Sequence, residues 1–198
     1  FPYTTLFRSI QYVRSLAFLR NHGIVHCDLK PSNTLMKPDF VIAVSDFGSA
    51  FRLSNPPDSL VSTVDYASPE VCRRTKDYGH AIDMWSVGAI IAELITGRTL
   101  FPSQGRPLQW LVHEAVLGVR YPFHWRDKAT TVISAESLST LMQNKGVENS
   151  PWERMIRQIL SIEPEHRPLP DDLLREPPLH VTKKRPLEAV STMNLRLP

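Results

Sequence analysis

Cysteine is scarce in this sequence: Cys27 and Cys72 are the only two among 198 residues. Two thiols are too few for a disulfide framework or for a cysteine-based zinc cluster. Because structural disulfides belong to oxidising compartments, this scarcity fits a reducing compartment. The chain is long enough, and at 42% hydrophobic apolar enough, to form one domain around a core of its own.

Long apolar segments and concentrated charge are missing as well. The longest apolar run, residues 84–95, is interrupted by Glu93 and is shorter than the about 20 residues that cross a bilayer. No secretory signal is recognisable, and the net charge of +3 is spread along the chain. We therefore expect no membrane and no nucleic acid among its partners, and an intracellular location that is cytoplasmic, nuclear or both.

The residues best suited to chemistry lie between positions 26 and 48. Asn33 and Asp46 offer the hard oxygen ligands that magnesium prefers. Asp28 can accept a hydrogen bond from an attacking hydroxyl, and Lys30 brings a positive charge to a phosphoryl group in transfer. Phosphoryl transfer needs positioning and charge stabilisation more than covalent chemistry. This stretch therefore favours magnesium-dependent phosphoryl transfer.

The same stretch resembles the eukaryotic protein kinases, whose catalytic loop reads H-R-D-L-K-x-x-N and whose metal loop reads D-F-G. Here the two motifs read HCDLKPSN at residues 26–33 and DFG at residues 46–48. Three further segments resemble motifs of that family and follow in its order: residues 62–70 (STVDYASPE), 83–88 (DMWSVG) and 164–168 (PEHRP). Five motifs in order, over residues 10–180, make a chance match implausible.

The resemblance implies a mainly α fold, the large C-terminal lobe of a protein kinase with a short β-hairpin at its catalytic edge. It implies a serine/threonine protein kinase that transfers the γ-phosphate of ATP to hydroxyl groups of a protein substrate. The implied cofactors are ATP and Mg²⁺, and the identity of any regulatory protein is left open. Lys30 and Thr63 both point to serine or threonine acceptors rather than tyrosine.

Each implied role has a plainer alternative. Asp28 is the implied catalytic base, with Lys30 and Thr63 beside it, but an Asp here can simply cap a turn. Asn33 and Asp46 are the implied metal ligands and, with Lys30, the implied nucleotide contacts. Ordinary Asx turns are the alternative for both.

Other residues of the motifs are implied to be scaffolding. Asp83 is expected to hold the catalytic-loop backbone, and Glu70 is expected to pair with Arg167. His26 and Trp85 are read as core residues. A further expectation concerns regulation, because Cys27 stands where the family usually has an arginine that pairs with a loop phosphate. Switching by loop phosphorylation is therefore not expected, and Cys27 is expected to be a buried, inert thiol.

Periodicity and turn signals predict the elements between the motifs. The predicted elements are a helix from Ile10 ending near Gly23, a hairpin of residues 35–36 and 40–44, a loop over residues 49–62, a helix over residues 81–96 ending at Gly97, a helix over residues 108–116, an irregular insertion over residues 126–150 and a helical stripe over residues 152–160.

The predicted domain layout has three parts. Residues 1–9 do not resemble the family and are expected to be a non-native scar or a disordered leader. Residues 10–180 are expected to form the kinase lobe, and residues 181–198 are expected to be a basic, disordered tail. The family's Gly-rich loop, strand Lys and helix Glu cannot be located before the catalytic loop, so we expect the small lobe to be missing and ATP binding to be poor. The alternatives are a non-catalytic, pseudokinase-like binding module and an inactive truncated gene product.

Overall fold

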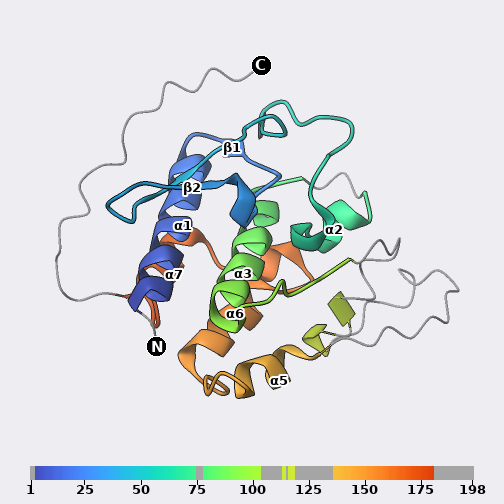
Figure 1. The fold of residues 1–198 in the computed structure, drawn as a ribbon. Helices are drawn as coiled ribbons and strands as arrows, with labels where there is room; N and C mark the ends of the chain where they lie inside the picture. The colour runs from blue at the N-terminus through green and yellow to red at the C-terminus, as the bar shows by residue number, and fades with distance from the viewer. Residues whose placement is uncertain (1–2, 75–77, 104–112, 115, 119–135, 181–198) are drawn as a thin grey trace, which may run out of the picture.

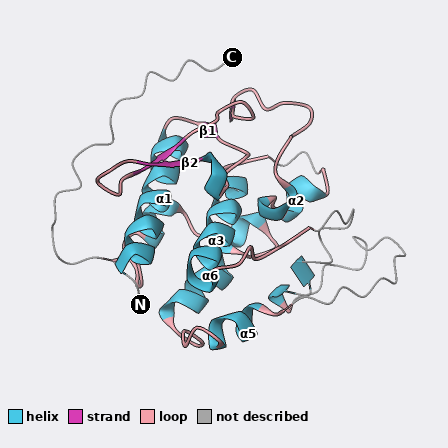
Figure 2. Ribbon diagram, viewed as in Figure 1, coloured by secondary structure: helices cyan, strands magenta, loops and turns pink. Residues whose placement is uncertain are grey.

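The computed structural model describes residues 3–74, 78–103, 113–114, 116–118 and 136–180. Helices dominate its secondary structure, and the strands that it describes are two or three residues long (Figure 2). The α-helices are α1 (Tyr3–Asn21), α2 (Pro69–Cys72), α3 (Ala81–Thr96), α5 (Leu138–Gln143), α6 (Pro151–Ile159) and α7 (Pro170–Leu173). The 3-10 helices are η1 (Pro31–Asn33), η2 (Val64–Tyr66) and η4 (Pro164–His166), and the strands are β1 (Ile24–Val25), β2 (Thr34–Met36), β3 (Ile42–Val44) and β4 (Phe51–Arg52).

Helix α3 lies at the centre of the fold, with α1 and α6 packed along it (Figure 1). Residues 82–92 of this helix are all buried, as its nearly continuous apolar sequence predicts. Gly88 lets α6 approach closely, because a side-chain carbon at this position would collide with Ile159. The helix ends as predicted, since Gly97 takes a φ of 73° and its amide bonds the Glu93 carbonyl at 2.7 Å.

Helix α1 begins earlier than predicted. The helix starts at Tyr3 rather than Ile10, and Thr5 and Ser9 are already buried. The description of residues 3–9 as disordered is therefore wrong, while their non-native origin stays a prediction. The predicted helix begins at Ile10 because residues 1–9 are set apart as unlike the family. Tyr3, Leu6 and Phe7 nevertheless continue the three- and four-residue apolar spacing of the helix, which packs on both α3 and α7.

Two short antiparallel ladders lie along the stretch of residues 24–52. Strands β2 and β3 pair with Thr34 opposite Val44 and Met36 opposite Ile42, which confirms the predicted hairpin. Strands β1 and β4 pair with Ile24 opposite Arg52 and Val25 opposite Phe51. The second ladder was not predicted, because two-residue strands leave no periodic signal. It ties the start of the predicted 49–62 loop back to the chain just before His26.

The predicted irregular insertion contains a helix. Helix α5 spans Leu138–Gln143, begins at Ser137, whose hydroxyl accepts from the Thr140 amide at 3.2 Å, and buries Leu138, Leu141 and Met142. The prediction is thus wrong for residues 138–143, and the part of it before residue 136 lies outside the described residues. Most of the predicted 108–116 helix and all of the 181–198 tail also lie outside them.

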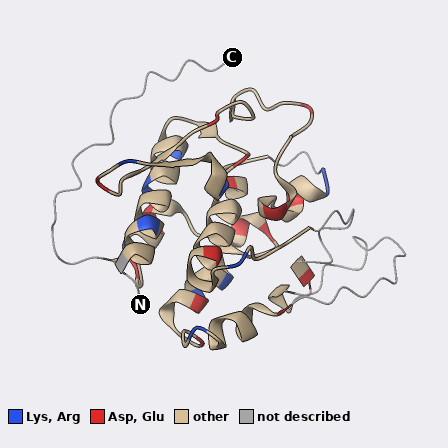
Figure 3. Cartoon of the chain, in the orientation of Figure 1, with Lys and Arg blue, Asp and Glu red and all other residues tan. Residues whose placement is uncertain are grey.

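Charge is distributed over the described elements rather than gathered on one of them. Helix α1 carries three arginines and no acidic residue, α3 carries Asp83 and Glu93 and no basic residue, and α6 carries charges of both signs (Figure 3). This agrees with the modest, dispersed net charge of the sequence. Within the described part of the chain, no helix has the length and apolarity to cross a membrane.

Candidate active site

The loop of residues 26–33 is fastened to the central helix α3. Asp83, 2% exposed in the first turn of α3, accepts the backbone amides of His26 at 2.7 Å and Cys27 at 2.8 Å. Cys27 has a φ of 68°, a left-handed conformation that costs a non-glycine residue about 1 kcal/mol. The two bonds to Asp83 offset that cost. Burial raises the pKa of Asp83 to about 6, although both backbone bonds lower it. The expected holding role of Asp83 is confirmed.

His26 is a core residue that links the loop to the DFG segment. It is fully buried, its Nε2 lies 3.1 Å from the Ser45 carbonyl, and its Nδ1 accepts the Asp28 amide at 3.3 Å. Its ring lies 4.8 Å from that of Phe47. Burial lowers the pKa of His26, with the Ser45 bond and the two nearby carboxylates opposing the shift. A neutral ring with Nε2 protonated satisfies both contacts, so His26 connects the segments rather than exchanging protons.

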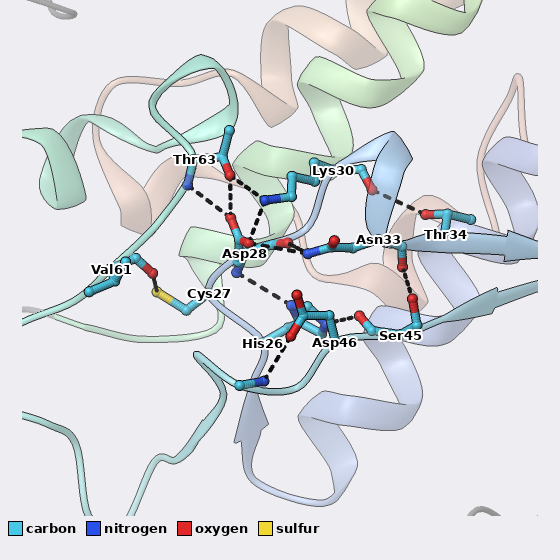
Figure 4. A network of polar contacts seen from close by, with 11 residues as sticks. His26, Cys27, Asp28, Lys30, Asn33, Thr34, Ser45, Asp46, Val61 and Thr63 are labelled. Atoms are coloured by element: carbon cyan, nitrogen blue, oxygen red, sulfur yellow. Dashed lines mark hydrogen bonds and ion pairs between the residues drawn. The ribbon is translucent and has the colours of Figure 1, made fainter.

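Asp28 is the meeting point of the site, and each of its carboxylate oxygens accepts two hydrogen bonds (Figure 4). Oδ1 accepts the Thr63 amide at 2.8 Å and the Thr63 hydroxyl at 2.7 Å. Oδ2 accepts Lys30 Nζ at 2.8 Å and Asn33 Nδ2 at 3.1 Å. Burial raises the pKa of Asp28, but hydrogen bonds from Lys30 and Thr63 outweigh it and hold the pKa below its usual value. Asp28 is therefore a carboxylate at neutral pH.

Lys30 and Thr63 are joined to each other as well as to Asp28. Lys30 Nζ lies 2.6 Å from Thr63 Oγ1. Thr63 directly precedes η2. Its amide and its hydroxyl both bond Asp28, so the 26–33 loop fixes its backbone and its side chain. The structure brings together three of the residues singled out from the sequence, on two segments that are 33 residues apart.

Asn33 and Asp46 lie on either side of the β2–β3 hairpin base. Asn33 is buried and directs Nδ2 at the carbonyl of Asp28 at 2.9 Å as well as at its carboxylate. Ser45, the neighbour of Asp46, donates its amide and its hydroxyl to the Asn33 carbonyl, each at 2.9 Å. Asp46 itself is exposed, has a φ of 60° and accepts the Gly48 amide at 3.3 Å. The charges of Asp28 and Asp46 both raise the pKa of His26 against the effect of its burial.

The donor set suits a hard divalent cation. The two partners of Asn33 Nδ2 are acceptors, so the amide must present its nitrogen to Asp28 and its oxygen elsewhere. An amide oxygen and an exposed carboxylate are ligands of the kind that Mg²⁺ takes, with water completing its shell. Among the described residues there is no group of three or more His, Cys, Asp and Glu side chains that could hold a metal ion.

Glu70 and Arg167 form the expected pair behind the site. Two bonds of 2.6 and 2.8 Å join the guanidinium to the carboxylate across 97 residues of sequence. The remaining donors of Arg167 reach the carbonyls of Ser161, Ala81 and Ile162. The guanidinium carbon also lies 5.1 Å from the centre of the Trp85 ring. This cluster fixes Glu70, at the end of the 62–70 segment, relative to the start of α3.

The structure also contains contacts that the sequence reading did not anticipate. Tyr12 of α1 donates its hydroxyl to Thr34 Oγ1 at 2.8 Å, and Gln11 clamps the hairpin by accepting the Ile42 amide at 2.6 Å. In the sequence, Gln11 and Tyr12 can be noticed only as polar groups on an otherwise apolar face of the predicted helix. That signal does not name the partner, because the partner lies more than twenty residues away.

Both cysteines have thiols of low reactivity. Cys27 is fully buried with its Sγ 3.8 Å from the Val61 carbonyl, and burial raises its pKa to about 12. Burial likewise raises the pKa of Cys72 to about 12. A thiol in this state is protonated at neutral pH and reacts slowly. The geometry agrees with the prediction that Cys27 is buried and inert.

Comparison with known proteins gives a consistent result. The family model described as "Protein kinase domain" matches residues 5–178. The chain is 34% identical to cyclin-dependent kinase F-3 of Oryza sativa subsp. japonica over 199 residues, which cover 94% of this chain and 45% of the relative. It is 33% identical to mitogen-activated protein kinase HOG1 of Scheffersomyces stipitis over 78% of this chain and 39% of the relative. It is also 33% identical to serine/threonine-protein kinase MAK of Rattus norvegicus over 89% of this chain and 30% of the relative. The chain thus spans less than half the length of these relatives.

Proposed function

Because this chain belongs to the eukaryotic protein kinase family, we propose that its parent protein transfers the γ-phosphate of ATP to serine or threonine hydroxyls of a protein substrate, with Mg²⁺. Residues 10–180 are proposed to be the large C-terminal lobe of that kinase. The matched relatives support the proposal, since one of them is named as a serine/threonine-protein kinase. So does the mainly helical fold with its hairpin beside the 26–33 loop.

The four-bonded carboxylate of Asp28 is the observation on which the proposal rests. Lys30, Asn33 and Thr63 fix its position, and their donors keep it ionised. A fixed carboxylate can orient a substrate hydroxyl and accept its proton as the hydroxyl oxygen attacks phosphorus. Lys30 then brings positive charge close to that oxygen. The Thr63 hydroxyl accepts from Lys30 and donates to Asp28, so it holds these two side chains next to each other.

Asn33 and Asp46 are proposed to hold Mg²⁺ through the amide oxygen and the carboxylate, and Lys30 to contact the transferred phosphate. When bound, the ion with ATP supplies the phosphoryl group and neutralises its charge. The chain's own contribution is the spacing of these ligands. Ser45 maintains it by joining the Asp46 segment to the Asn33 carbonyl.

A second candidate is a non-catalytic kinase-like binding module, and one observation favours it. The described donors already occupy both lone-pair positions of each Asp28 oxygen. A substrate hydroxyl must therefore displace one of these donors before Asp28 can accept from it. If the displacement does not happen, the fold keeps its shape and performs no transfer.

The deciding experiment compares Asp28→Asn with a matched change at an exposed loop position, Asp58→Asn, in the parent protein. Transfer of phosphate from ATP to casein in the presence of Mg²⁺ is the readout. Loss of a positioned base should lower kcat by about 10²–10⁴-fold in Asp28→Asn, and Asp58→Asn should match the parent. Serine or threonine should be the only acceptors found in the product. A parent protein without transfer above the level of Asp28→Asn would support the binding module instead.

A further inference from the structure

Tyr12 connects the first helix to the strand that follows the 26–33 loop. Its side chain is 4% exposed, and its hydroxyl donates to Thr34 Oγ1 at 2.8 Å. A buried hydroxyl needs such a partner, since leaving it unpaired costs about 1–3 kcal/mol. Burial raises the pKa of Tyr12, and the bond to Thr34 opposes the rise only in part. Tyr12 therefore remains a hydrogen-bond donor throughout the neutral pH range.

Thr34 passes the contact on to the backbone of the 26–33 loop. Its Oγ1 lies 3.3 Å from the Lys30 carbonyl, to which it donates, and its amide bonds the Pro31 carbonyl. The Lys30 carbonyl also accepts the Asn33 amide at 3.1 Å, which is the bond that closes η1. Thr34 thus contacts this turn twice, once through its side chain and once through its backbone. Lys30 directly precedes this turn, and Asn33 is its last residue.

The opposite side of the turn is bonded to the segment of Asp46. The Asn33 carbonyl accepts both the amide and the hydroxyl of Ser45. A shift of η1 would therefore move Asn33, Lys30 and the start of the DFG segment together. Figure 4 shows Thr34 bonded back to Lys30 and Ser45 bonded to Asn33.

We propose that Tyr12 and Thr34 are positioning residues of the phosphoryl-transfer site: their hydroxyls form a relay from α1 to the Lys30 carbonyl that fixes η1, and through it Lys30 and Asn33. The chemical meaning of this relay rests on the proposed function, because Asn33 is proposed there as a metal ligand. The geometry of the relay is independent of the proposed function, because it consists of hydrogen bonds between described residues. Packing alone is the competing explanation, since the Tyr12 ring is buried among apolar residues of the core.

Single-hydroxyl variants separate positioning from packing. Tyr12→Phe keeps the ring, and Thr34→Val keeps the size of the side chain, so each removes mainly one hydroxyl. Thr34→Ser restores the hydroxyl of Thr34. Ser15→Ala is the matched control, because the Ser15 hydroxyl on the same helix bonds only the Gln11 carbonyl within α1 among its described contacts.

The measurements are amide hydrogen exchange on the full chain without metal, and binding of Mn²⁺ alone, followed by paramagnetic broadening. Loss of one neutral buried hydrogen bond corresponds to about a fivefold change in an opening equilibrium. The Asn33 and Ser45 amides should therefore exchange about fivefold faster in Tyr12→Phe and Thr34→Val, and amides of α3 should not change. The Mn²⁺ dissociation constant should rise by a similar factor. Thr34→Ser and Ser15→Ala should match the parent in both measurements.

Two results would overturn the relay. One is unchanged exchange at Asn33 and Ser45 in both hydroxyl-deletion variants. The other is an equal acceleration at α3 amides, which would mean that the hydroxyls support the fold generally. A parent chain that binds no Mn²⁺ would refute the proposed metal site, and the exchange pattern would still decide on the relay.

Discussion

Arg167→Ala should be among the most damaging single substitutions in this chain. The side chain of Arg167 is 1% exposed and that of Glu70 is 5% exposed, so the pair is almost fully removed from water. Alanine would leave the Glu70 carboxylate buried with its two guanidinium bonds gone, and the carbonyls of Ser161, Ala81 and Ile162 would lose a donor. Breaking a buried pair by removing one partner costs about 3–5 kcal/mol. We expect the free energy of unfolding to fall by that amount.

Urea denaturation of the full chain, followed by the fluorescence of its tryptophans, measures this change. The matched control is Arg175→Ala, which removes an exposed pair with Asp172 whose side chains are 76% and 59% accessible. Exposed pairs of this kind contribute about 0–1 kcal/mol, so the control should unfold close to the parent midpoint. The double variant Glu70→Ala with Arg167→Ala should lose less than the sum of its single variants. A loss below about 1 kcal/mol for Arg167→Ala, or strict additivity of the pair, would refute the reasoning.

Two further predictions concern titration and thiol chemistry. Hydrogen bonds hold the pKa of Asp28 below its ordinary 3.8 despite burial, so the unfolded chain binds more protons at this position than the folded chain. The stability that Asp28 contributes is therefore present above about pH 4 and is lost as the pH falls through the folded pKa. The difference in unfolding free energy between the parent and Asp28→Asn should shrink on acidification, and a difference that grows would contradict the assigned hydrogen bonds. Because Cys27 is fully buried and burial raises its pKa to about 12, a disulfide reagent at pH 8 should label Cys27 in the native chain only as fast as the loop of residues 26–33 opens, and should label it at once in urea. Rapid labelling of Cys27 in the native state would show that this loop is not packed as described.

The two corrected elements differ from prediction for different reasons. Helix α1 includes residues 3–9, which are set apart in the prediction because they do not resemble the family, although the apolar spacing of Tyr3, Leu6 and Phe7 indicates a helix. Helix α5 begins at a serine cap and is a short helix with three buried residues. A turn and a half of helix offers too few positions for periodicity to stand out, so only its docking on the core decides that it forms.

The residues of the site itself were identifiable from the sequence, because phosphoryl transfer restricts residue types at fixed local spacing. Asp28, Lys30 and Asn33 lie within one loop, and Asp46 follows a hairpin whose alternation is readable, so these candidates could be named before any coordinates. Their roles remain proposals. The resemblance also implied Thr63 beside Asp28, and its amide and hydroxyl both bond the Asp28 carboxylate. What the sequence could not supply is a partner such as Ser45, which bonds the Asn33 carbonyl.

The sequence by itself determined the central apolar helix, the glycine that ends it and the order of the motifs, because each depends on residues within a few positions of one another. Tertiary structure alone decided that the Tyr12 hydroxyl meets Thr34 across 22 residues. A hydrogen bond between distant segments depends on how whole helices and strands pack, and packing is a property of the assembled core rather than of any local stretch of sequence.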